Sequence, residues 1–286
     1  MLREIRELGF GHAELSHGIR LSLVPGIIEA VDGGDIQITT LHNFCPLPLG
    51  ISRAAPNVFK FTSLDRRERE NALRHTLKTL ELAERVKARL VVLHMGAVEI
   101  RDYTDKLIEM VGEGHRETPK YRRLCEEAEV KREARKERHQ EVAFELLRQI
   151  EEEARRRGLL LGVENREALE EIPFESDFPS FMFEFRGGVV RYWHDTGHAQ
   201  IKENLGFIQH AMHLESMAEE LAGFHIHDVE FPGRDHRPPG KGMIDFAALK
   251  PFVKPEHIKV IELSPSLTHE EVLAGAEHIR SIWGAE

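Results

Sequence analysis

Short apolar runs alternate along this chain with longer segments in which apolar residues recur every three or four positions. The short runs lie near residues 12, 38, 91, 161, 192, 225 and 260 and are rich in branched aliphatic side chains, as is typical of buried strands. The longer segments, such as 66–87 and 270–283, have the spacing of amphipathic helices. Strands and helices that alternate in this way predict an α/β fold with a parallel sheet covered by helices.

The number of predicted strands suggests a particular architecture. A (β/α)8 TIM barrel has eight strands, whereas the pattern shows seven and the chain begins on a helix predicted at 2–8. We therefore expect a TIM barrel that lacks its first strand or has it truncated, formed as a single domain by residues 1–286. An open barrel of seven strands is the alternative.

One segment departs from the pattern. Residues 118–157 are dense in Glu, Arg and Lys and carry few apolar positions, which predicts a long, solvated helix. We expect its first half to project from the body or to pack on a partner subunit of a homo-oligomer. Its second half, from about Gln140, is expected to face the core.

Composition limits the classes of function. The formal charge of −10 over 286 residues opposes charge-driven binding to nucleic acid or to an anionic membrane surface. Two cysteines do not make a disulfide framework. No secretory signal pattern precedes the first helix, and no apolar run reaches membrane-spanning length. We expect a cytoplasmic protein that acts on a small molecule.

The carboxyl ends of the predicted strands carry metal-ligand residue types. Active sites of βα barrels lie at this edge of the sheet, so these side chains are expected to converge. Carboxylates combined with imidazoles suit Zn²⁺, Mn²⁺, Mg²⁺ or Co²⁺, and the identity of the metal stays open. The residues are His42, His94, Glu164, Asp195 with His198, His225 or His227, and Glu262.

The segment Asp195-Thr196-Gly197-His198 concentrates two of these types. Side chains alternate along a strand, so Asp195 should share a face with Trp193 and point away from His194. We expect Gly197 to allow a sharp turn that brings His198 beside Asp195, and the next helix to begin near Leu205.

Taken in order, the motifs resemble the xylose isomerase-like TIM barrel superfamily. Its members include sugar phosphate isomerases and epimerases and the apurinic endonucleases of family 2. The resemblance runs from about Ile36 to the C-terminus. It is carried by Val91-Val92-Leu93-His94-Met95-Gly96, Gly162-Val163-Glu164-Asn165, Asp195-Thr196-Gly197-His198, His225-Ile226-His227-Asp228, Arg234-Asp235-His236 with Pro239-Gly240-Lys241-Gly242, and Ile261-Glu262.

This resemblance implies one divalent metal ion bound by four side chains: Glu164, Asp195, His225 and Glu262. His225 is preferred to His227 because it lies three residues before Asp228, as in the His-x-x-Asp motif of the family. Both histidines share a face of the strand, so His227 stays an alternative ligand.

The resemblance also implies a reaction. In epimerase-like members, the carboxylates that match Glu164 and Glu262 flank the substrate and move a proton at the carbon beside a carbonyl, through an enediolate. A metal ion polarises the oxygens, and bases of suitable pKa carry the proton. We therefore expect an isomerase or epimerase acting on a sugar, sugar phosphate or cyclitol, with Arg237 and Lys241 in contact with the substrate.

Two other functions stay open. Endonuclease-type members bind three zinc ions and hydrolyse phosphodiesters, and His42, His94, His198 and His236 resemble their extra ligands. These four residues and His227 are the possible additional metal or substrate ligands. Against this alternative, Arg234 replaces an aspartate expected two residues before His236, and we do not expect a nucleic acid partner. A barrel that only binds a ligand is disfavoured because Glu164 and Glu262 are both retained.

Overall fold

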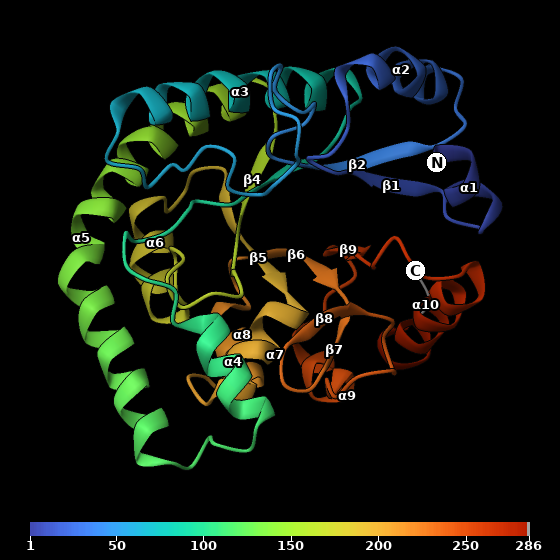
Figure 1. The fold of residues 1–286 in the computed structure, drawn as a ribbon. Coiled ribbons are helices and arrows are strands. Elements are labelled where there is room, and N and C mark those ends of the chain that lie inside the picture. Colours follow the sequence, from blue (N-terminus) through green and yellow to red (C-terminus); the bar gives the residue numbers. More distant parts are fainter. Residues whose placement is uncertain (285–286) are drawn as a thin grey trace. The chain divides into compact units, whose positions relative to one another are not determined.

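The structure, a computed structural model, describes residues 1–284 (Figure 1). The chain groups into two compact units. The first comprises Met1–Ala97, Arg138–Glu164 and Met182–Arg191, and the second comprises Val98–Glu137, Asn165–Phe181 and the chain from Tyr192 onward. A single domain over 1–286 stays a prediction, and its last two positions lie outside the described residues.

The first unit contains a run of parallel strands in chain order. β1 (His12–Leu15), β2 (Gln37–His42), β3 (Leu90–Leu93) and β4 (Leu160–Glu164) each pair with the next. Every residue of β3 is buried, as expected for a strand covered on both faces. The accompanying helices are α1 (Leu2–Glu7), α2 (Val24–Asp32) and α3 (Arg66–Arg85), with a short 3-10 turn at Leu21–Leu23.

The second unit continues the parallel pattern. The end of β5 (Val190–Asp195) pairs with β6 (Leu221–Ile226), which pairs with β9 (Ile258–Ile261). The helices of this unit are α4 (Thr104–Gly112), α7 (Thr196–Leu205), α8 (His210–Met217), α9 (Phe246–Leu249) and α10 (His269–Trp283). α6 (Phe178–Glu184) begins in this unit, and 3-10 turns occur at Glu175–Asp177 and Lys250–Phe252.

The main sheet has seven strands in the order β1-β2-β3-β4-β5-β6-β9. This confirms the predicted α/β class and the sequential parallel order of a βα barrel with seven strands. Within residues 1–284, no helix combines the length and apolarity needed to cross a membrane.

A small hairpin lies between β6 and β9. β7 (Asp228–Glu230) and β8 (Arg234–Arg237) pair antiparallel. The carboxylate of Asp228 accepts hydrogen bonds from four backbone N–H groups, those of Val229, Gly240, Gly242 and Ile244. One buried side chain therefore organises the whole 228–244 segment, which local propensity does not reveal.

The charged segment forms one helix, α5 (Pro119–Arg156). Leu147, Ile150 and Ala154 are fully buried, which confirms that its second half faces the core. The first half contains buried side chains and does not simply project, whereas packing on a partner subunit stays a prediction. Arg132 is buried there, where its guanidinium donates to the carbonyls of Leu169 and Glu171 and pairs with Asp177.

Candidate functional site

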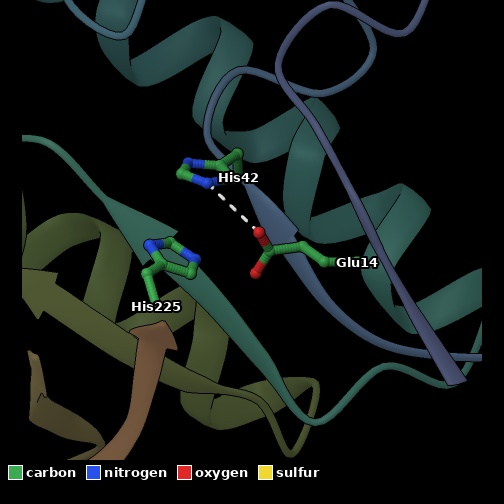
Figure 2. Close-up of side chains that lie close together, drawn as sticks. All are labelled: Glu14, His42 and His225. Atoms are coloured by element: carbon green, nitrogen blue, oxygen red, sulfur yellow. Dashed lines mark ion pairs between the residues drawn. The ribbon is translucent and has the colours of Figure 1, made fainter. Parts of the chain in front are cut away.

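In the first unit, a buried carboxylate lies beside one of the predicted histidines. Oε1 of Glu14, on β1, is 3.1 Å from Nε2 of His42, the last residue of β2 (Figure 2). The hydroxyl of Thr40 donates to the other carboxylate oxygen at 2.6 Å, because the strand register places Glu14 opposite Thr40. Sequence reasoning found no role for Glu14; its signal was a single carboxylate between the apolar positions of a short strand.

A second carboxylate–imidazole pair follows on the next two strands. Nε2 of His94 lies 2.6 Å from Oε2 of Glu164, and both side chains are buried. The rings of His17, His42 and His94 form a row, with centroids 5.5 and 5.2 Å apart. The first unit thus brings together His42, His94 and Glu164, as predicted for residues at the carboxyl ends of neighbouring strands.

In the second unit, three of the predicted metal ligands converge. Nδ1 of His225 lies 3.2 Å from Oε2 of Glu262 and 4.0 Å from Oδ2 of Asp195. The register of β5 with β6 places Asp195 opposite His225, and Glu262 follows the last residue of β9. The ring of Trp193, on the same face as Asp195, packs edge-on against the ring of His225, with the two centroids 5.0 Å apart.

Helix α7 begins directly after Asp195, which differs from the turn predicted there. Asp195 is the N-cap residue: its Oδ1 accepts a hydrogen bond from the backbone N–H of His198 at 2.7 Å. Such a cap satisfies a helix donor that would otherwise lack a partner. His198 does return to Asp195, with Nδ1 3.4 Å from Oδ2, but a helical turn brings it there. Gly197 is needed for space, because a Cβ at this position would lie 2.0 Å from Cε1 of His227.

The two candidate histidines of β6 and its continuation have different surroundings. Both ring nitrogens of His227 have protein partners: Nε2 lies 3.0 Å from Oδ1 of Asp195, and Nδ1 accepts the backbone N–H of His236 at 2.9 Å. Nδ1 of His225 faces the carboxylates of Glu262 and Asp195, at 3.2 and 4.0 Å. This arrangement favours His225 over His227 as a metal ligand.

A further set of donors lies next to the first. Glu167, His198 and Asp235 each offer one atom within 4.8 Å of the others. Burial raises the pKa of Glu167, and the nearby carboxylates of Asp235 and Glu171 add to the effect. Crowded carboxylates with an imidazole favour a cation. Glu167 was missed because it follows the strand end by three residues.

His236 and Asp235 form an ion pair at 3.0 Å. Burial opposes the charge on His236, but its contacts with Asp235 and Glu262 raise its pKa to about 11. The ring of His236 also stacks on that of His227 at 4.3 Å. His236 is therefore cationic near neutral pH in the protein alone.

The two predicted substrate contacts lie on or after the hairpin. Arg237, on β8, has its Nε 3.6 Å from Oε2 of Glu230. Lys241 is exposed in the loop that Asp228 organises. Their contact with substrate stays a prediction.

Comparisons with known proteins agree on the fold. The family model described as "Xylose isomerase-like TIM barrel" matches residues 2–282. A solved structure of 3-keto-D-glucoside 4-epimerase from E. coli is 15% identical, with a TM-score of 0.67 over 98% of this chain and 92% of that chain. D-psicose 3-epimerase in the presence of D-fructose and the IolI protein with a bound zinc atom are each 14% identical, with TM-scores of 0.66 over 99% of this chain and 93% of theirs. A search of curated proteins found no match.

Proposed function

Because the chain belongs to the family of xylose isomerase-like TIM barrels, we propose that it is a sugar isomerase or epimerase that depends on a divalent metal ion. The observation that carries this proposal is the convergence of Asp195, His225 and Glu262 at the ends of three neighbouring strands. The names of the similar structures, epimerases of a ketoglucoside and of psicose, support a carbohydrate substrate.

The donor chemistry of this cluster fits a divalent ion. Two carboxylates and one imidazole make a mixed shell that accepts Zn²⁺, Mn²⁺, Mg²⁺ or Co²⁺, and the zinc atom in IolI supports the first of these. We propose Asp195, His225 and Glu262 as ligands. Glu164 is the fourth ligand that the family resemblance implies, and the variant Glu164→Gln tests whether it binds the metal ion.

Two carboxylates are proposed to move the proton. Glu262 keeps 28% of its side chain exposed, which leaves it accessible to substrate. Glu164 is held by Nε2 of His94 at 2.6 Å. One takes the proton from the carbon beside the carbonyl and the other returns it, which carries the substrate through an enediolate. A bound metal ion supplies Lewis-acid polarisation of the substrate oxygens.

The substrate class is a sugar, sugar phosphate or cyclitol, and we propose that Arg237 and Lys241 contact its hydroxyl or phosphate groups. Neither cysteine forms a disulfide, which agrees with a cytoplasmic location. A homo-oligomeric state stays a prediction.

One observation favours a second candidate function, zinc-dependent hydrolysis of a phosphodiester. The donors Glu167, His198 and Asp235 offer a place for a further metal ion. One bound ion per chain is expected for the isomerase, and three are expected for the hydrolase.

The decisive experiment is the substitution Glu262→Gln. It removes the charge and the basicity while nearly preserving shape, so exchange of the proton beside a ketose carbonyl with solvent deuterium should fall at least about 100-fold. Exchange is followed by NMR, with Glu219→Gln, at an exposed carboxylate without a proposed role, as the matched control.

Unchanged exchange in Glu262→Gln would remove this residue from the mechanism. Cleavage of abasic DNA by a protein that binds three zinc ions and shows no exchange would replace the isomerase by the hydrolase.

A further inference from the structure

His227 is held by contacts with Asp195, Thr196 and His236. We propose that His227 is a positioning residue: it does not bind the metal ion but holds the carboxylate of Asp195 in the orientation that metal binding requires. This inference rests on the proposed metal site and adds to it a residue that touches neither metal nor substrate.

The hydrogen bonds define the protonation pattern of the ring. A backbone N–H can only donate, so the 2.9 Å contact from the N–H of His236 requires an unprotonated Nδ1 on His227. The proton of the neutral imidazole then lies on Nε2. That nitrogen is 3.0 Å from Oδ1 and 3.1 Å from Oδ2 of Asp195, so it donates to the carboxylate. Neither nitrogen of His227 keeps a lone pair for a metal ion.

The ring cannot easily leave this position. His236 stacks on it with an interplanar angle of 9°, and Gly197 approaches so closely that a Cβ would collide with three ring atoms. The backbone of His227 is fixed as well, because the hydroxyl of Thr196 donates to its carbonyl at 2.7 Å and accepts from its N–H at 3.1 Å.

These contacts give a common reason for the residues that separate Asp195 from His198. Thr196 holds the backbone of His227, and Gly197 makes room for its ring. The side chain of Asp195 is thus held from two directions, by the N–H of His198 and by Nε2 of His227. Groups that orient a metal ligand in this way typically contribute 10- to 100-fold to metal affinity.

Two substitutions at the same position separate the two hydrogen bonds of the ring. The amide of Gln reaches the place of Nε2, so His227→Gln keeps a donor to Asp195. The amide of Asn reaches only the place of Nδ1, so His227→Asn keeps the acceptor for His236 and loses the donor to Asp195. We expect Zn²⁺ affinity, measured by competition with a chromogenic chelator, to fall by about 10- to 100-fold in His227→Asn and by less than about threefold in His227→Gln.

Three further measurements make the result specific. The thermal midpoints of the metal-free variants should lie close together, since both keep one of the two bonds. The visible absorption of added Co²⁺ should change in His227→Asn, because the carboxylate changes its coordination, and stay as in the wild type in His227→Gln. Gly197→Ala, which displaces the ring, should weaken Zn²⁺ binding in the same direction as His227→Asn.

Equal Zn²⁺ affinity and equal Co²⁺ spectra in His227→Asn and His227→Gln would overturn the positioning role. His225→Ala separates this failure from that of the proposed function. If His225→Ala loses Zn²⁺ while both His227 variants bind normally, the metal site stands and the inference is wrong. If His225→Ala itself binds as the wild type does, the proposed metal site fails and the inference fails with it.

Discussion

Single buried polar residues in this protein are held by several partners at once. Asp228 accepts four backbone N–H groups, and Arg132 is shared between two carbonyls and Asp177. Burial works against the charge of Asp177, yet Arg132 and Lys136 lower its pKa. Removing one partner of such a buried ion pair leaves an uncompensated buried charge, which is strongly destabilising.

Arg132→Leu should therefore destabilise the protein far more than an exposed arginine variant on the same helix. We expect a loss of about 3 kcal/mol in the free energy of unfolding, because the buried Asp177 carboxylate loses its main partner. Arg148→Leu, which breaks an exposed pair with Glu184, should cost less than about 1 kcal/mol. Urea denaturation of both variants measures the difference, and equal losses would contradict the argument.

At the scale of elements, the two faces of β5 make contacts with different parts of the protein. Asp195 and Trp193 lie on the face with His225. Tyr192 and His194 lie on the other face and form a buried hydrogen-bonded cluster with α8. The hydroxyl of Tyr192 is 2.6 Å from His194 and 2.9 Å from His213, and His194 is 2.9 Å from His210. These hydrogen bonds attach α8 to β5, the strand that carries the proposed metal ligand Asp195.

This cluster should make stability depend on pH. Burial lowers the pKa of His210 and of His213 to about 3, whereas both titrate near 6.5 in the unfolded chain. Below pH 6.5 these two histidines bind protons in the unfolded state but stay neutral in the folded state. Their contribution to the free energy of unfolding is therefore fully present above pH 6.5 and is lost as the pH falls toward 3. Each histidine contributes up to about 1.4 kcal/mol per pH unit.

His213→Gln should reduce the slope of the free energy of unfolding between pH 6.5 and 5, measured by urea denaturation in EDTA. His115→Gln, at an exposed histidine outside the cluster, is the control and should leave the slope as in the wild type. An identical slope in both variants would show that His213 does not titrate as its burial implies.

At the scale of the whole molecule, the proposed ligands come from strands that are far apart in the sequence. Asp195 is the last residue of β5, His225 lies in β6, and Glu262 directly follows β9. An ion that joins such segments binds the folded chain and not the unfolded one, so it should stabilise the fold by mass action.

Zn²⁺ at 100 times its dissociation constant should raise the free energy of unfolding by about 2.7 kcal/mol, and EDTA should reverse the effect. Asp195→Asn should abolish this shift, and Glu164→Gln should reduce it if the implied fourth ligand is correct. The exposed variant Glu219→Gln should respond as the wild type does. Thermal or urea unfolding with and without metal measures these shifts, and a wild type that does not respond to Zn²⁺ would contradict the site.

The sequence by itself determined the strands and the residue types at their carboxyl ends. Apolar runs, alternation and helical spacing are local properties, so they were enough to predict the parallel sheet, the helical nature of 119–156 and the place of His42, His94, Glu164, Asp195 and Glu262.

Only the tertiary structure decided between residues that local spacing leaves equivalent. His225 and His227 share a face of one strand, and the difference between them lies in Asp195 and the N–H of His236, which belong to other segments. Glu14 gained its partners from β2 through strand register, and Gly197 is required by a ring thirty residues later in the chain. Hydrogen bonds between distant segments depend on atoms that only folding brings together, which is why periodicity placed these residues but could not assign their roles.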